Sequence, residues 1–409
     1  MQDNEKKPAL RFKGFTDPWE QRKISELAEK TYGGGTPTTS NEAFWNGNIP
    51  WIQSSDIVDG KLMGVEPRKY ITQTGLNSSA TQLVPKNSIA IITRVGVGKL
   101  AYMPFSYSTS QDFLSLSKLN TEPFFTVYAC YKKLQSELNT VQGTSIKGIT
   151  KDELLAKTIS VPVYSEQKQI GSFFAQLDTL ITLHQRKYEK LVNIKKSMLD
   201  KMFPKNGASV PEIRFKGFTD PWEQRKLAEI ANFSKGVGYS KNDLCEEGTP
   251  IILYGRLYTK YETCIFDVDT FVKEKAGGVY SKGGEVIVPA SGETAEDISI
   301  ASVVVKPGIL LGGDLNVVSP TTEYDSAFLA LTISSGAAHE YLSSLAQGKS
   351  VVHLHNTDIQ SVSAKFPTKR EQEKIHLLFG KIDTLITLHQ RKLEKLQNIK
   401  KSCLEKMFV

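Results

Sequence analysis

Only a few residues of the chain have the types and spacings that could bind a metal or a phosphate. The four cysteines, at positions 130, 245, 264 and 403, form no CxxC pair and lack zinc-ligand spacing. His353 and His355 form an HxH pair without an evident third ligand. Gly348-Lys349-Ser350 is similar to the end of a phosphate-binding loop, but Ser343 stands where its first glycine should be. These patterns favour structural or surface roles, and we expect no catalytic residue, metal or cofactor.

The length, net charge and hydropathy of the chain indicate what class of protein carries any functional site. At 409 residues the chain is too long for one ordinary core, which predicts two or more domains. The net charge of +7 is a mild bias towards anionic partners. The first ten residues are polar and charged, unlike a signal peptide, and no apolar run approaches the ~20 residues of a membrane span. We therefore expect a cytoplasmic protein.

A long internal repeat organises the sequence. RFKGFTDPWEQRK occurs at 11–23 and, with all 13 residues identical, at 214–226. Residues 177–203 recur at 382–408 with five differences in 27 positions. Residues 27–140 and 230–345 show no convincing alignment to each other. A unit of about 200 residues is too long for a solenoid, whose repeats are roughly 20–50 residues. Near-identity in the frame and divergence in the inserts predict one shared role for the frame and two different roles for the inserts.

The repeated frame has the period of a coiled coil. From Ile170 to Met202 the seam positions alternate in steps of four and three, and the second copy follows from Ile375 to Met407. Each seam holds two polar residues, His184 with Lys195 and His389 with Lys400, which we interpret as setting register and orientation. Two such helices would bury both apolar stripes by pairing, and a two-fold relation between the halves makes them antiparallel. The remaining basic face, displayed twice, suits two copies of one partner protein; its residues are Arg186, Lys187, Lys190, Arg391, Lys392 and Lys395.

Short β-type runs broken by glycine-rich turns fill both inserts. The first has such runs at 49–52, 88–93, 100–103 and 113–116, with a helix expected at 124–138; the second has them at 250–254, 285–288, 300–305 and 315–318. The fold class is therefore α+β, with two globular domains separated by a pair of long antiparallel coiled-coil helices in internal pseudo-two-fold symmetry. The predicted segments are an arm (1–26), a first variable domain (27–160), a helix (161–203), the repeated arm (204–229), a second variable domain (230–365) and a second helix (366–409).

These pieces together resemble the specificity subunit of Type I restriction–modification systems. The resemblance is carried by GGGTPTTSNEAFWNGNIPWIQSSDI (33–57), ITRVGVGK (92–99) and SQDFLSL (110–116). It is also carried by the entries into the two helices, VPVYSEQKQI (161–170) and FPTKREQEKI (366–375), and it covers essentially the whole chain, less clearly in the second variable domain.

The resemblance implies that each variable domain is a target recognition domain for one half of a bipartite DNA sequence. The paired helices would set the unread spacer and dock two adenine methyltransferase (modification) subunits, and through them the restriction subunits with their motor and nuclease. The chain itself has no two adjacent prolines, so it lacks the Asn/Asp-Pro-Pro-aromatic loop of such a methyltransferase. It is therefore expected to be a non-catalytic subunit.

Base reading needs side chains with paired donors and acceptors, whereas basic side chains bind phosphate. In polar, glycine-adjacent loops we select as DNA-binding residues Gln53, Ser54, Ser55, Arg94, Lys99, Gln111 and Lys147 in the first domain, and Tyr254, Arg256, Tyr258, Lys260, Lys282, Ser291 and Lys349 in the second. Trp19 and Trp222 of the arms are expected to pack against the frame.

Two other functions stay open at this point. A repressor or architectural protein with a coiled-coil spacer would bind DNA tightly without a methyltransferase. A scaffold whose variable domains bind proteins would give no DNA shift and an association that is insensitive to salt.

Overall fold

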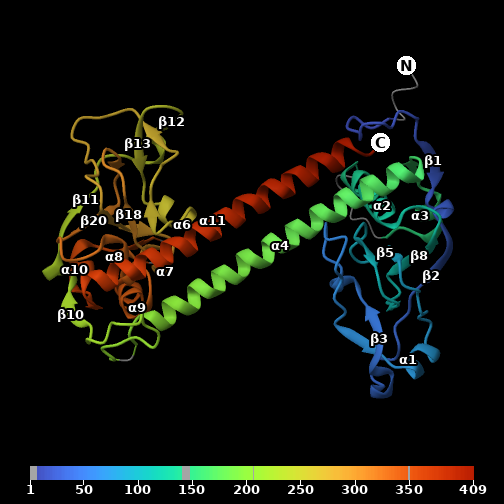
Figure 1. Ribbon diagram of the computed structural model, residues 1–409, viewed down its shortest axis with the longest axis horizontal. Coiled ribbons are helices and arrows are strands. Elements are labelled where there is room, and N and C mark those ends of the chain that lie inside the picture. Colours follow the sequence, from blue (N-terminus) through green and yellow to red (C-terminus); the bar gives the residue numbers. More distant parts are fainter. Residues whose placement is uncertain (1–6, 141–147, 206, 349–350) are drawn as a thin grey trace. The chain divides into compact units, whose positions relative to one another are not determined.

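The computed structural model describes residues 7–140, 148–205, 207–348 and 351–409. The chain divides into two compact units: unit 1 is residues 1–185 with 391–409, and unit 2 is residues 186–390. Two long helices, α4 (Tyr164–Met202) and α11 (Lys369–Lys406), each contribute one part to unit 1 and the other to unit 2 (Figure 1). Both helices lie within three residues of the bounds predicted for the helical segments, 161–203 and 366–409.

Unit 1 is built around two small sheets. A four-stranded sheet has the order β2-β8-β5-β6 and a three-stranded sheet has the order β4-β3-β7. Their strands are β2 (Ala28–Gly33), β3 (Trp45–Ile52), β4 (Lys69–Ile71), β5 (Ser88–Ile92), β6 (Leu100–Met103), β7 (Ser108–Thr109) and β8 (Phe113–Leu119). The shorter helices of the unit are α1 (Gln73–Asn77), α2 (Pro123–Thr140) and α3 (Lys151–Ala156). The strands and the helix predicted for the first insert are thus confirmed.

Unit 2 repeats this topology with one additional edge strand on each sheet, β14 and β12, although the two inserts do not align in sequence. Its main sheet has the order β11-β20-β16-β18-β14, and a second sheet has the order β12-β15-β13-β19. The strands are β11 (Ala231–Lys235), β12 (Leu244–Cys245), β13 (Thr249–Ile252), β14 (Cys264–Ile265), β15 (Phe271–Val272), β16 (Glu285–Pro289), β18 (Ser302–Val304), β19 (Leu310–Leu311) and β20 (Leu315–Pro320). A further pair joins β17 (Ser291–Gly292) to β21 (Val352–His353). The helices are α5 (Leu227–Ile230), α6 (Arg256–Thr259), α7 (Ala295–Ile298), α8 (Ser326–Ile333), α9 (Gly336–Leu345) and α10 (Asn356–Ser361).

The repeated arms attach to the frame in the same way in both units. Strand β1 (Glu20–Lys23) pairs antiparallel with β9 (Thr158–Val161), and β10 (Glu223–Lys226) pairs with β22 (Ser363–Phe366). Arg11 donates two hydrogen bonds of 2.7 Å to the fully buried carboxylate of Glu166. Arg214 does the same to Glu371, at 2.7 and 2.8 Å. Such two-point contacts fix orientation as well as distance, so each arm is held in one position.

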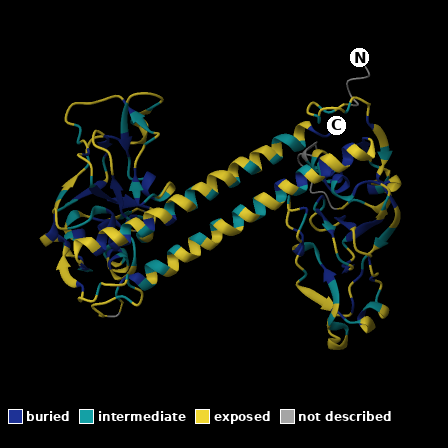
Figure 2. Cartoon of the chain, viewed as in Figure 1, coloured by how far each residue is buried: buried dark blue, intermediate teal, exposed yellow. Residues whose placement is uncertain are grey.

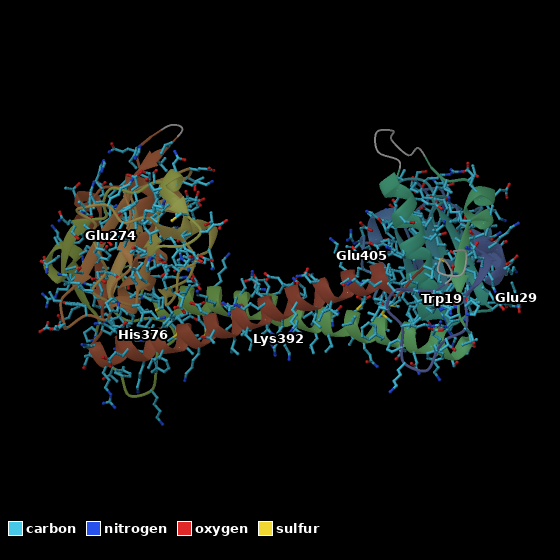
Figure 3. The ribbon with its side chains drawn as sticks, turned by 90° about the horizontal axis from the view of Figure 1, so that it is seen from above. Trp19, Glu29, Glu274, His376, Lys392 and Glu405 are labelled. Atoms are coloured by element: carbon cyan, nitrogen blue, oxygen red, sulfur yellow. The ribbon has the colours of Figure 1, made fainter. Side chains whose placement is uncertain are left out.

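The end of each long helix enters the aromatic core beside an arm. Trp19, which is labelled in Figure 3, is 2% exposed. Its ring lies against those of Phe125 and Phe408. Trp222 lies against Phe203 and Phe328 in unit 2. Both arm tryptophans therefore pack against the frame, as expected from the sequence.

The seam predicted from the heptads is confirmed by burial. All its positions, from Ile170 to Met202 and from Ile375 to Met407, are buried or half-buried. Figure 2 shows the resulting stripes along both long helices. Within unit 1, Phe174 contacts Phe408 and Asp178 pairs with Lys400, so the two helices run in opposite directions there.

Candidate nucleic-acid interface

Most of the selected residues of unit 1 gather in loops at one edge of its sheets. Strands β3 and β7 are parallel, with Ile52 opposite Thr109, so Gln53 and Gln111 follow at the same end. Arg94 follows β5, whose Ile92 lies opposite Phe113 at the start of β8. We call this set of loops loop edge 1; it comprises residues 34–36, 53–55, 93–99 and 110–112.

Four backbone hydrogen bonds hold the loops of edge 1 together. Gly35 N donates to Thr109 O at 2.8 Å, Ser110 N to Ile52 O at 2.9 Å, Thr93 N to Asp112 O at 2.7 Å, and Ile149 N to Thr93 O at 2.7 Å. A Cβ on Gly34 would lie 1.8 Å from Ser110 O, so the close approach of this backbone segment to Ser110 requires glycine.

Unit 2 builds its corresponding edge with the same four hydrogen bonds. Val237 N donates to Leu311 O at 2.9 Å, Gly312 N to Ile252 O at 2.9 Å, Ala290 N to Asp314 O at 2.8 Å, and Leu354 N to Ala290 O at 3.0 Å. Gly236 takes the place of Gly34, since a Cβ there would lie 2.1 Å from Gly312 O. We call residues 236–239, 253–258, 290–292 and 312–314 loop edge 2.

The two edges therefore share a backbone scaffold and differ in their side chains. Where edge 1 has Gln53, Ser54, Arg94 and Gln111, the hydrogen-bond equivalence places Leu253, Tyr254, Ser291 and Gly313 in edge 2. Edge 1 thus presents amides, hydroxyls and cations, whereas edge 2 presents the neighbouring rings of Tyr254 and Tyr258, with centroids 6.2 Å apart. Two sites built alike but lined differently can bind the same kind of polymer with different sequence preferences.

Exposure decides which selected side chains of edge 1 can meet a ligand. Ser55, Arg94 and Gln111 are exposed, while Gln53, Ser54 and Lys99 are half-buried. The Gln53 amide donates to Ser55 Oγ at 2.9 Å, and Gln111 Oε1 accepts from Thr36 Oγ1 at 2.7 Å. Lys147 and, in unit 2, Lys349 lie outside the described residues.

Two selected residues of unit 2 are held inside the domain. The Arg256 side chain is 8% exposed and pairs with Glu262 at 2.6 Å and Asp269 at 3.1 Å. It also donates to Asp267 O at 3.1 Å, so its guanidinium is committed to holding α6 on the following segment. Ser291 is 6% exposed, with its Oγ 3.2 Å from His353 Nδ1. Selecting Arg256 from the sequence overlooked the acidic residues at 262, 267 and 269 that could bury it.

The remaining selected cations of unit 2 differ in position. Lys260 is exposed at the end of α6 and bonds Asp269 Oδ2 at 2.8 Å, and this hydrogen bond lowers the pKa of that carboxyl. Lys282 precedes β16, whereas edge 2 follows the other end of that strand, where Pro289 lies opposite Leu315. The fold therefore does not bring Lys282 to loop edge 2.

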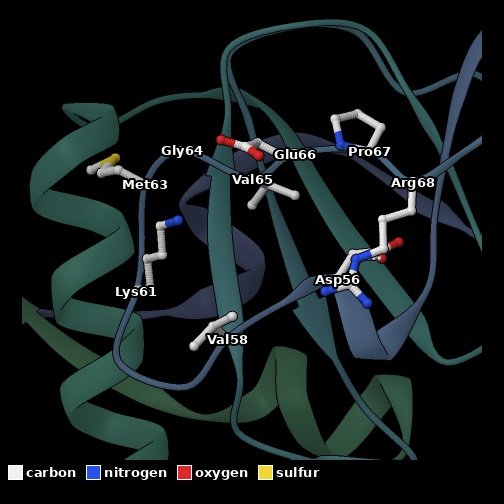
Figure 4. A pocket seen from close by; sticks show the side chains of 9 residues that line it. All are labelled: Asp56, Val58, Lys61, Met63, Gly64, Val65, Glu66, Pro67 and Arg68. Atoms are coloured by element: carbon white, nitrogen blue, oxygen red, sulfur yellow. Dashed lines mark ion pairs between the residues drawn. The ribbon is translucent and has the colours of Figure 1, made fainter. Parts of the chain in front are cut away.

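Asp56 is a positioning residue that was not selected from the sequence. It is 7% exposed; its Oδ2 accepts the Gln53 N–H at 3.0 Å, and its Oδ1 lies 3.5 Å from Arg68 Nε. It lines a pocket of about 230 Å³ together with Lys61, Glu66 and Arg68 (Figure 4). The sequence indicated this role only through the position of Asp56, three residues after Gln53, which is the spacing of a capping box.

The basic face selected for a partner lies on the surface of the long helices. Arg186, Lys187 and Lys190 on α4 are exposed, as are Arg391, Lys392 and Lys395 on α11. Figure 3 labels Lys392 among them. Exposed leucines precede each set, Leu180 and Leu183 on α4 and Leu385 and Leu388 on α11. The face is thus both apolar and basic, which heptad counting alone did not predict.

The cysteines and the possible metal ligands considered from the sequence show no arrangement of a reactive site within the described residues. Burial raises the pKa of the Cys130 thiol to about 12 and that of Cys264 to about 11. Within the described ranges, no group of three histidine, cysteine, aspartate or glutamate residues is arranged to hold a metal ion. The same ranges contain no helix of the length and apolarity that crossing a bilayer requires.

Known proteins match this chain over almost its whole length. A family model described as the Type I restriction modification DNA specificity domain matches twice, at residues 16–193 and 219–398. The MjaIX Type I restriction enzyme specificity subunit of Methanocaldococcus jannaschii is 23% identical over 406 residues, covering 95% of this chain and 92% of that protein. The EcoR124I/EcoR124II specificity subunit of Escherichia coli is 30% identical over 199 residues, 44% of this chain and 48% of its own length.

A solved structure has the same fold. The S subunit of a Type I restriction–modification system from M. genitalium superposes with a TM-score of 0.68 at 16% identity, covering 98% of this chain and 99% of that one. Since the family model matches well over half of the residues, in two copies that fall on the two halves of the repeat, the chain belongs to the family of Type I restriction–modification DNA specificity subunits.

Proposed function

We propose that loop edge 1 and loop edge 2 each read one half of a bipartite DNA target on behalf of a Type I restriction–modification complex. The observation that carries this is the shared scaffold: four equivalent backbone hydrogen bonds build both edges, while the side chains on them differ. A protein that read one palindromic sequence would need like side chains at both edges. Unlike side chains on one scaffold fit a target with two different halves.

The proposed recognition domains are residues 27–160 and 230–365, each between an arm (1–26 or 204–229) and a helical segment (161–203 or 366–409). For base contacts in edge 1 we propose Gln53, Ser54, Ser55 and Gln111, with Arg94, Lys99 and Lys147 on phosphates. For edge 2 we propose Tyr254 and Tyr258, with Lys260 and Lys349 on phosphates. Arg256 and Ser291 then act by holding their loops, and Lys282 would need DNA that extends to the far end of β16.

The exposed face of the long helices is proposed to dock two methyltransferase (modification) subunits and, through them, the restriction subunits. Leu180 and Leu183 supply apolar area next to the cations Arg186, Lys187 and Lys190, and the second copy offers the same combination. Repetition of this face gives two equivalent docking sites. The chain would contribute the address on DNA, and its partners would perform the methylation and cleavage.

Methylation mapping tests this function. Cells that carry the partner subunits are sequenced for modified adenine with and without the gene for this chain. The proposal predicts that the gene adds methylation at one gapped motif with two different halves. No change at any gapped adenine motif, or a change at a palindrome, would refute it.

A further inference from the structure

A lysine of one long helix pairs with an aspartate of the other inside unit 1. Lys400 Nζ lies 2.6 Å from Asp178 Oδ1, and both side chains are shielded, with 13% and 14% exposed. The other oxygen of Asp178 accepts the hydroxyl of Tyr128, on α2, at 2.6 Å. Lys400 also donates to Gly60 O at 3.1 Å and lies 5.7 Å from the centre of the Tyr128 ring. One carboxylate therefore contacts the opposite helix and the first recognition domain together.

Unit 2 contains the same arrangement with a different hydroxyl. Lys195 Nζ lies 2.5 Å from Asp383 Oδ1, and Thr263 Oγ1 donates to Asp383 Oδ2 at 2.9 Å. Lys195 lies 5.6 Å from the ring centre of Tyr261. Thr263 precedes β14 and Tyr128 lies on a helix, so the two hydroxyls come from unrelated parts of their domains. Two unlike recognition domains thus place a hydroxyl on the same repeated carboxylate.

The two ion pairs define one helix register. Both aspartates and both lysines are repeats at an offset of 205, and the paired residue numbers add to 578 in each unit. Slipping α11 along α4 by three or four residues would put Cys403, Leu396 or Leu404 near Asp178 in place of Lys400. The carboxylate would then be shielded without its cation, which costs far more than an exposed pair is worth.

We propose that Asp178 and Asp383 are positioning residues that couple helix register to the seating of each recognition domain, and so set the number of unread base pairs the protein accepts. This inference rests on the proposed function. One oxygen of each carboxylate fixes the register, and the other fixes the domain on the helices. A domain that loses its hydroxyl contact keeps its loop edge, and therefore its half-site, but its angle on the helix pair is less firmly fixed.

The sharpest variants are Tyr128→Phe and Thr263→Val, which remove one hydroxyl each and leave the ion pairs in place. Asp178→Asn is a stronger variant that weakens both contacts. Tyr102→Phe is the matched control in the same domain, since that hydroxyl bonds Asn87 at 2.7 Å on the surface. Asp200→Asn is the control on α4, where the exposed carboxylate bonds only the exposed Lys205 among the described residues.

The full chain, assembled with its methyltransferase partners, is titrated with duplexes that hold both mapped half-sites at the native gap and at one base pair more or less. We expect the wild type and both controls to prefer the native gap. Tyr128→Phe and Thr263→Val should lower that preference at least threefold, while a scrambled half-site still costs each variant the wild-type factor.

An unchanged gap preference, or an equal loss of affinity on all three duplexes, would overturn the inference, because a merely structural contact produces the second pattern. If the proposed function itself is wrong, the result differs, because the wild type will then show no preference for a duplex that holds both half-sites.

Discussion

Replacing Phe408 by alanine should loosen unit 1 and leave unit 2 as it is. The Phe408 ring is 7% exposed and contacts three aromatic rings, those of Trp19, Phe125 and Phe174, at centroid distances of 6.4, 5.7 and 5.6 Å. Phe203 is its repeat in unit 2, 9% exposed and packed on Trp222 and Phe328. The two substitutions are therefore a matched pair, one for each unit.

The size of the effect follows from the burial of the ring. Truncating a buried phenylalanine to alanine costs about 3–5 kcal/mol, from lost transfer free energy and the cavity left behind. At about 1.4 kcal/mol for each factor of ten, opening of the affected core should become roughly 100-fold more frequent or more. Two units need not unfold together, so a single melting temperature would hide the effect.

Hydrogen exchange followed by mass spectrometry resolves the two units peptide by peptide. Phe408→Ala should reduce protection in α2 and in residues 164–178 of α4, and Phe203→Ala should reduce it in α8 and in the start of α11. Val409→Ala, at a position that is 48% exposed, is the control. A loss of less than tenfold in unit 1, or equal losses in both units from Phe408→Ala, would refute this account of the core.

Three further predictions concern the frame. Gly171→Ala should destabilise unit 1 by about 1–3 kcal/mol, because its Cβ would lie 2.3 Å from Glu122 Oε2 and 2.7 Å from Phe125 N. Gly380→Ala, in open space on α11, should instead stabilise the protein by about 0.5–1 kcal/mol. Chemical denaturation of both variants checks this. Burial raises the pKa of Glu122 above its ordinary 4.5, so unit 1 should gain stability as pH falls from that raised pKa towards 4.5. Burial also acts to raise the pKa of Asp325, but hydrogen bonds from His376 and the Phe328 N–H outweigh it and lower that pKa below 3.8. Unit 2 should therefore lose stability as pH falls below 3.8. Exchange at several pH values should show both trends, with Glu122→Gln abolishing the first and Asp325→Asn the second. A chain ending at Phe203 should dimerise through its helix, because Asp178 of one copy can pair with Lys195 of the other, and read a palindrome of the first half-site; a monomer in sedimentation would contradict the pairing.

Local sequence patterns predicted the frame well because its determinants repeat every three or four residues. The heptad from Ile170 to Met202 ends where α4 ends and begins six residues after its first residue, Tyr164, and short apolar runs located β5 and β6. The topology that the two recognition domains share, apart from the additional strands β12 and β14 of unit 2, could not be predicted in this way. It depends on pairings such as that of Ile52 with Thr109, which lie far apart in the chain and leave no local period.

The site was predicted less completely for the same reason. Residue type and a neighbouring glycine selected Gln53, Arg94 and Gln111, and the strand pairing brings these three residues to loop edge 1. They did not distinguish Lys282, at the far end of β16, from residues of loop edge 2. Nor did they distinguish the buried Arg256 from a free cation, since its partners Glu262 and Asp269 follow at no regular spacing.

The most direct test of two independent readers on one frame is to change one reader and map the methylation motif again. In the double variant Gln53→Ala, Gln111→Ala, we expect one half of the motif to become degenerate, while the other half and the gap stay as in the wild type. A motif whose two halves relax together, or a motif that is unchanged, would contradict the claim that loop edge 1 alone reads one half.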